Sequence, residues 1–146
     1  MRVSDAMALV TVDVGRGSAA AAALRGLAAA FRAARRPVVH AVETDLAASL
    51  APAAASGLDI ELLAAGGVQT LAPAEMAIGL GDPGAFDATP LDTLLRGLGV
   101  DTVVLGGPMP SPRVSASIVA AELRGYRVLL ATDELAVTLG AHLTAA

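Results

Sequence analysis

The chain has 146 residues, and its ten cationic side chains are all arginine, because the sequence contains neither lysine nor cysteine. This composition excludes a thiolate nucleophile, a disulfide framework, a cysteine zinc site and a Schiff-base lysine. The formal net charge is −4, with only two Phe and one Tyr. The chain therefore lacks the basic face and the aromatic stacking surface that nucleic-acid binding requires.

The chain is 55% hydrophobic, yet no stretch predicts a membrane span. The apolar run at 100–109 contains Asp101 and is far shorter than the roughly 20 residues that cross a bilayer. The first ten residues, MRVSDAMALV, lack the apolar core of a signal peptide. We therefore expect a cytoplasmic protein without membrane contact, folded as a single domain over 1–146.

The first half of the chain predicts alternating strands and helices. Residues 7–14 (MALVTVDV) form a nearly continuous apolar run, which is typical of a strand buried on both faces. A Gly-rich turn follows, and 19–35 predicts an amphipathic helix that ends before Pro37. Residues 37–42 (PVVHAV) predict the second strand. The segment 43–74 has no clear period, apart from a possible short helix near 59–64.

The second half repeats this alternation. Strands are expected at 75–80, 101–106 and 126–131, and helices at 90–98 and 112–124. Strands alternating with helices indicate an α/β fold with a parallel sheet. We expect a three-layer αβα, Rossmann-like fold whose mostly parallel sheet has five to six strands.

Three stretches carry a resemblance to a known family. They are ALVTVD at 8–13, AFDATPLD at 85–92, and the long stretch 94–135, which contains GVDTVVLGG and RGYRV. Together they resemble the isochorismatase-like cysteine hydrolase superfamily, which includes nicotinamidases and N-carbamoyl amidohydrolases. The resemblance covers most of the chain.

The resemblance implies a catalytic triad of aspartate, lysine and cysteine. Asp13 matches the aspartate that ends the first strand. The lysine position falls at Leu80, with Gly79 as the alternative register, and the cysteine position falls at Arg113. Two of the three catalytic groups are therefore replaced.

These replacements predict an ion pair between Asp13 and Arg113. A buried carboxylate needs a partner, and a guanidinium can pair with it through two hydrogen bonds. The family's oxyanion turn corresponds to Gly107, Pro108, Met109 and Pro110. Because proline has no N–H group, this turn has fewer donors for an oxyanion.

Other motifs favour ordinary structural roles. Residues 79–84 match G-x-G-x-x-G formally, but a Gly-rich turn is favoured over nucleotide binding because no helix opens directly after them. His40 lies among valines and is interpreted as a satisfied core or pocket-edge histidine, and His142 as exposed. Glu43 and Asp45 favour a solvated loop, so we expect no metal and no cofactor.

Three serines lie near the replaced nucleophile, namely Ser111, Ser115 and Ser117. A serine nucleophile needs a base within hydrogen-bond reach, and only Asp13 is available. Because Arg113 would hold that carboxyl ionised, capping by Ser111 and packing by the other two are favoured.

The leading hypothesis is a catalytically degenerate member of this superfamily that binds a small molecule or assembles with other chains. The resemblance also implies a homo-oligomer, a dimer or larger. The rival hypothesis is an active hydrolase or isomerase of a small carbonyl or amide metabolite, in which Asp13 and Arg113 act without a cysteine. A structural subunit of a hetero-complex is the third alternative.

Overall fold

The computed structural model describes residues 6–12, 19–42, 59–81, 84–87, 89–107 and 112–131. Its strands are β1 (Met7–Val12), β2 (Val38–Val42), β3 (Val68–Ala72), β4 (Glu75–Gly79), β5 (Thr102–Gly106) and β6 (Arg127–Leu130). Its helices are α1 (Ala19–Ala33), α3 (Ile60–Ala64), α4 (Leu91–Gly97) and α5 (Pro112–Leu123).

All six strands belong to one sheet, in the order β3-β4-β2-β1-β5-β6. β1 pairs in parallel with β2 and β5, while β4 and β6 extend the sheet in the same direction. Only β3 runs antiparallel to its neighbour among the described strands. The mostly parallel α/β sheet that the sequence predicts is confirmed.

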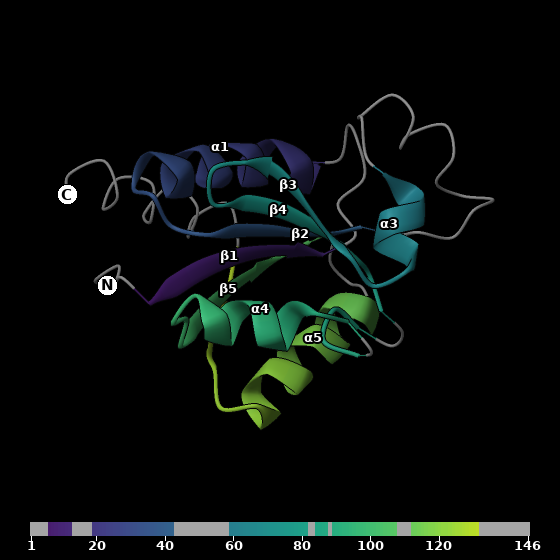
Figure 1. Ribbon diagram of the computed structural model, residues 1–146. Coiled ribbons are helices and arrows are strands. Elements are labelled where there is room, and N and C mark those ends of the chain that lie inside the picture. The colour runs from purple at the N-terminus through teal and green to yellow at the C-terminus, as the bar shows by residue number, and fades with distance from the viewer. Residues whose placement is uncertain are drawn as a thin grey trace.

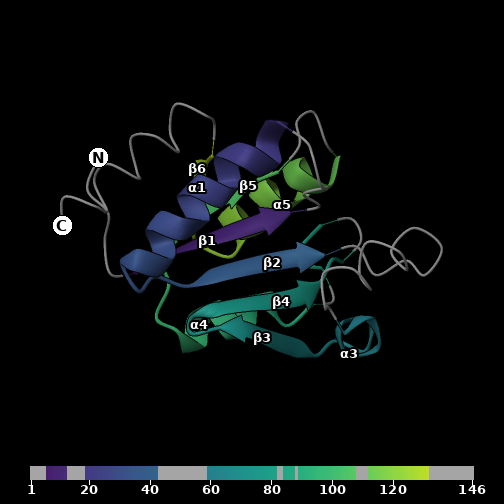
Figure 2. The same cartoon turned by 90° about the horizontal axis from the view of Figure 1, so that it is seen from above.

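Helices cover the two faces of the sheet unequally. Figure 1 shows α1 on one face and α4 and α5 on the other, with α3 at one end of the sheet. Seen from above in Figure 2, α1 crosses the β1 side, and β2, β4 and β3 lie beside it. One sheet face can therefore hold polar side chains next to α1.

The hydrophobic core consists of two clusters separated by the sheet. Leu24, Leu27 and Phe31 of α1 pack on Leu9, whereas its neighbour Val10 belongs to the cluster under α4 and α5. Successive residues of a strand point to opposite faces, so a strand covered on both sides must be apolar throughout. Every residue of β1 is accordingly buried.

The segment between β2 and β4 differs in part from the sequence expectation. The short helix near 59–64 is confirmed as α3, and Asp59 caps it by accepting the Leu62 N–H at 3.1 Å. The strand β3, however, was not expected. It is a half-exposed edge strand with a register shift between Thr70 and Ala72, so its residues lack the clear alternation of a half-buried strand.

Candidate functional site

The carboxyl ends of the five parallel strands meet at one edge of the sheet. β1 lies between β2 and β5, and the chain winds in opposite directions on its two sides. In open α/β sheets, ligands bind outside the carboxyl ends of the strands at such a reversal. The candidate site therefore lies where β1 ends at Val12 and β5 ends at Gly106.

Gly107 lies at this reversal and packs tightly against both neighbouring elements. A Cβ atom at Gly107 would overlap the carbonyl oxygen of Val12 and lie 2.8 Å from Cγ2 of Val114. Only a residue without a side chain fits there. The backbone after β5 is thus held against the end of β1 and the first turn of α5.

The structure describes two of the three proposed triad positions, Leu80 and Arg113. Leu80 follows β4 at the same edge, where its N–H donates to the Val42 carbonyl at 2.7 Å. Arg113 is the second residue of α5 and is half-buried. Asp13, Pro108, Met109 and Pro110 lie outside the described residues. The Asp13–Arg113 ion pair and the shape of the turn therefore stay predictions.

Ser117 connects the first turns of α5 to the segment before α4. Its hydroxyl is fully buried, donates to the Arg113 carbonyl at 2.7 Å and accepts the Ala85 N–H at 2.9 Å. Gly84 lies so close that a Cβ there would approach the Ser117 Oγ to 2.9 Å. Ser117 therefore fixes the position of the start of α5 through two hydrogen bonds, in addition to packing in the core.

The geometry does not support Ser117 as a nucleophile. Both hydrogen bonds of the Ser117 hydroxyl go to backbone groups, and no side-chain base contacts it among the described residues. Ser115 is exposed on the opposite side of α5, and Ser111 lies outside the described residues. The structural interpretation of Ser117 agrees with its burial.

A chain of polar side chains crosses β1, β2 and β4 on the face that α1 covers in part. Thr11 Oγ1 lies 2.7 Å from Nδ1 of His40, and the other ring nitrogen lies 3.2 Å from Glu75. Arg32 of α1 completes the chain by donating to both carboxylate oxygens at 3.1 and 3.2 Å. A carboxylate only accepts, so the Nε2–H of His40 donates to Glu75, and Nδ1 lies within hydrogen-bond distance of the Thr11 hydroxyl. His40 is thus the satisfied histidine that the sequence favours.

This chain has the order of a hydroxyl–histidine–carboxylate triad but not its surroundings. Thr11 is only 5% exposed, and the backbone around it and His40 is paired with neighbouring strands. Those N–H groups cannot form an oxyanion hole. The contacts instead join three strands to α1. The sequence indicates one member of this chain, because His40 lies two residues after the buried Val38 and hence on the same face of β2. It does not indicate the partner Glu75, which is 35 residues away.

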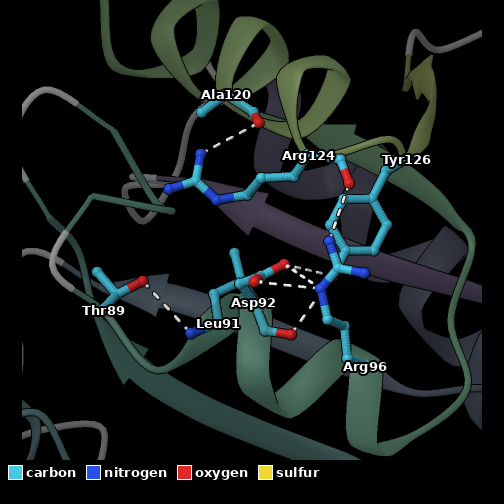
Figure 3. A network of polar contacts seen from close by, with 7 residues as sticks. All are labelled: Thr89, Leu91, Asp92, Arg96, Ala120, Arg124 and Tyr126. Carbon is cyan, nitrogen blue, oxygen red and sulfur yellow. Dashed lines mark hydrogen bonds and ion pairs between the residues drawn. The ribbon is translucent and has the colours of Figure 1, made fainter.

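A second polar cluster fastens α4 to the turn before β6 (Figure 3). The Tyr126 hydroxyl donates to Asp92 at 2.8 Å, and Arg96 donates to the same carboxylate at 3.1 and 3.2 Å. The Arg96 guanidinium also stacks over the Tyr126 ring, 5.3 Å from its centroid. Arg124 lies over the Phe86 ring in the same way.

Burial and these contacts displace two pKa values. Burial raises the pKa of the Tyr126 hydroxyl, and its hydrogen bond to Asp92 raises it further, to about 12. Burial alone would raise the pKa of Asp92. The Tyr126 and Arg96 hydrogen bonds outweigh it and hold that pKa below its usual value. The cluster joins α4 to the segment between α5 and β6, and its contacts are structural.

The formal G-x-G-x-x-G stretch does not have the geometry of a dinucleotide loop. β4 ends at Gly79, and the described residues between it and Leu91, where α4 begins, contain a turn at 85–87 but no helix. Phosphate groups bind such motifs at a helix N-terminus that follows the glycines directly. The ordinary turn is therefore the better interpretation.

The described residues contain no group of three metal-ligating side chains. In the same part of the chain, no helix is long and apolar enough to cross a membrane. Glu43, Asp45 and His142 lie outside the described residues.

The chain is similar to one protein family over nearly its whole length. The model of the isochorismatase domain matches residues 3–138. No curated protein matches the chain.

Several solved structures share the fold. An isochorismatase family protein from Burkholderia thailandensis is 22% identical, with 90% of this chain and 80% of that chain covered and a TM-score of 0.63. N-carbamoylsarcosine amidase from Thermoplasma acidophilum is 23% identical, with coverage of 91% and 83% and a TM-score of 0.61. A cysteine hydrolase from Pseudomonas syringae pv. phaseolicola 1448A is 19% identical, with coverage of 91% and 74% and a TM-score of 0.60. At these identities the likeness shows the fold.

Proposed function

The chain belongs to the isochorismatase family, and on that premise we propose that it is a catalytically degenerate member which binds a small molecule or assembles with other chains. The observation that carries the proposal is the absence of cysteine and lysine from the whole sequence. The family resemblance assigns one of each to the reaction, so covalent catalysis through a thioester has no nucleophile here.

The position of Arg113 supports this proposal. Its helix begins beside Gly107, at the edge where ligands of parallel sheets bind. A guanidinium in the first turn of α5 supplies positive charge where a thiolate would need to attack. We propose that Arg113 pairs with Asp13 and that this pair replaces the triad. Pairing would keep Asp13 ionised and make it a weak base.

Leu80 also supports the proposal of a degenerate site. It follows β4, which β2 separates from β1. It is half-buried and packs against the core cluster under α4 and α5. A leucine can neither stabilise a negative charge nor donate a proton. If the register of the resemblance holds, the site has lost its lysine to an apolar side chain that contributes packing instead.

The alternative is an active hydrolase or isomerase of a small carbonyl or amide metabolite. In that case Asp13 would transfer the proton, and Arg113 would stabilise the developing charge without a covalent intermediate. The half-buried position of Arg113 is compatible with both functions.

Enzyme assays separate these two functions. Wild type and Asp13→Ala are incubated with amide, carbamoyl and vinyl-ether substrates, and ammonia or product release is measured. The degenerate function predicts no turnover above the uncatalysed rate in either protein. Turnover by the wild type that disappears in Asp13→Ala would overturn the proposal in favour of the alternative.

Assembly is tested by the molar mass in solution. We propose that residues 1–146 form a single domain and that copies of it form a homo-oligomer. Light scattering coupled to size exclusion should give a mass of at least twice the 14.4 kDa of one chain. A monomer that also forms no complex with other chains would leave small-molecule binding as the role.

A further inference from the structure

The helix α5 is apolar on both of its sides. Val114, Ala120 and Ala121 are buried against the core. On the outer side, Val119 is 57% and Leu123 81% exposed, the highest fractions among the large hydrophobic residues that the structure describes. In Figure 1, α5 is the lowest of the labelled helices, on the face of the sheet opposite α1. A helix that is hydrophobic all round is normally buried, so we expect another surface to cover this side of α5.

The outer side of α1, the other long helix, has a different character. Arg25 and Arg32 are exposed on it and lie on one side of the helix, because they are two turns apart. None of the residues described as exposed in α1 is a large hydrophobic one. Such a polar side is typical of a helix that faces water. Among the exposed residues of α5, by contrast, Glu122 alone carries a charge.

The outer side of α5 carries an apolar seam that is complementary to itself. The seam consists of Pro112, Ala116, Val119 and Leu123, which are spaced by four, three and four residues. This is the spacing at which residues line one side of a helix and pack against a second helix. If two copies of α5 lie antiparallel, Leu123 of each meets Pro112 of the other, and Val119 meets Ala116. Each larger side chain then lies against a smaller one, whereas a parallel pair would place like against like.

Charge also favours the antiparallel orientation. Glu122 lies in the last turn of α5, and no ion pair joins it to another residue among those described. The first turn of α5 contains no acidic residue that could lie at the positive end of the helix dipole. In an antiparallel pair, each Glu122 lies beside the N-terminal end of the other helix, where a negative charge is favourable.

We propose that a second copy of this chain covers the outer side of α5, with the two α5 helices antiparallel about a two-fold axis that passes between Ala116 and Val119. The small side chain of Ala116 allows the helix axes to approach to about 8–10 Å. Each copy then buries Val119 and Leu123, and the hydrocarbon removed from water stabilises the dimer. This inference rests on the homo-oligomer proposed above and specifies its surface and symmetry.

Two matched substitutions test whether this side of α5 is the interface. The dissociation constant of the dimer is measured by sedimentation equilibrium, and circular dichroism verifies folding. Leu123→Glu should raise this constant by about a hundredfold or more, because each dimer loses two buried leucines and gains two charges in the seam. Leu71→Glu makes the same change at a leucine that is also exposed, on the edge strand β3, and should leave the constant unchanged.

The failure of this inference differs from the failure of the homo-oligomer. A dimer that folded Leu123→Glu leaves intact would refute the α5 interface, while the homo-oligomer would stand. Dissociation by Leu71→Glu alone would place the interface at β3 and also refute it. A wild type that is monomeric at every concentration would refute both. The enzyme assays concern the degenerate function alone.

Cysteine cross-linking tests the antiparallel orientation. Because the chain contains no cysteine, Ala116→Cys and Val119→Cys each introduce a single thiol. The two variants are mixed, left to exchange subunits and mildly oxidised, and mass spectrometry identifies the joined peptides. A disulfide between positions 116 and 119 should form faster than one between two like positions. Predominance of the like pairs would show a parallel arrangement and overturn the proposal.

Discussion

Ser117 holds the backbone of Ala85 against α5: the serine Oγ accepts the alanine N–H at 2.9 Å inside the core. The O–H of the same hydroxyl donates to the carbonyl one helical turn earlier, at Arg113. One hydroxyl therefore links the segment before α4 to the turn of α5 that carries the proposed replacement for the nucleophile. The start of α5 has a fixed position because of this link.

Replacing this hydroxyl should destabilise the protein. Ser117→Ala leaves the buried Ala85 N–H without a partner, at a cost of about 1–3 kcal/mol. The free energy of unfolding from urea titration measures this loss. Ser115→Ala, on the exposed side of the same helix, serves as the control and should stay within about 0.5 kcal/mol. Equal effects of the two substitutions would contradict the role given to Ser117.

Two glycines should respond oppositely to the same substitution. Gly107→Ala introduces a Cβ that overlaps the Val12 carbonyl, and we expect a loss of about 2 kcal/mol or more. Gly97→Ala, in α4, places its Cβ where no atom lies within 4 Å and should be neutral or stabilise by about 0.4–1 kcal/mol. Thermal and urea unfolding measure both effects. A harmless Gly107→Ala would show that the ends of β1 and β5 are less close than described.

The fold was largely predictable because its signals are local. The buried strand at Met7–Val12 is a continuous apolar run, and Phe31 recurs at helical spacing from Leu24 and Leu27. The edge strand β3 was not predictable by the same means. Its residues are half exposed and its register shifts, so packing against β4 rather than its own pattern determines its conformation.

For the candidate site, the sequence predicts which residues follow strands, but not which side chains contact one another. Sequence order places Leu80 and Arg113 after strands and hence at one edge of a parallel sheet, and the structure has both there. The hydrogen bond from Ala85 to Ser117 joins residues 32 apart, and the contact of His40 with Glu75 joins residues 35 apart. Such pairs depend on sheet order and register, which local patterns do not contain.

Tyr126 provides a spectroscopic test of the cluster with Asp92, because it is the single tyrosine and the chain has no tryptophan. Absorbance at 295 nm should show the folded protein titrating near 12, since burial and the Asp92 hydrogen bond raise the pKa of Tyr126 to about 12. In concentrated urea the midpoint should return to about 10. Asp92→Asn should lower the folded midpoint toward 10. A folded midpoint near 10 in the wild type would contradict the described contact.

The same pKa shifts give the pH range of stability. The pKa of Tyr126 is higher in the folded state, so its contribution is complete below pH 10 and is lost as the pH rises toward about 12. The pKa of Asp92 is lower in the folded state. Its contribution is therefore present above about pH 4 and is lost as the pH falls through the folded value. Unfolding free energies of Tyr126→Phe should lack the alkaline loss.

Rebuilding the family triad tests the register directly. Arg113→Cys restores a thiol in the first turn of α5, where the helix N-terminus favours a thiolate, and Leu80→Lys restores the ammonium after β4. We expect the double variant to release ammonia from amide or carbamoyl substrates at least about tenfold faster than the wild type. A low rate is expected because each missing oxyanion donor costs about 10²–10³ in kcat, and the turn contains prolines.

Two controls distinguish a wrong alignment of Leu80 and Arg113 with the triad from a turn at 107–110 that has too few N–H donors. Adding Asp13→Ala to the double variant should abolish the gained activity, because the family resemblance assigns the proton transfer to this aspartate. Adding Pro108→Ala restores one backbone N–H and should raise the rate if the turn limits it. A folded double variant whose thiol reacts with an alkylating reagent, but which stays inactive with and without Pro108→Ala, would contradict the alignment of Leu80 and Arg113 with the triad.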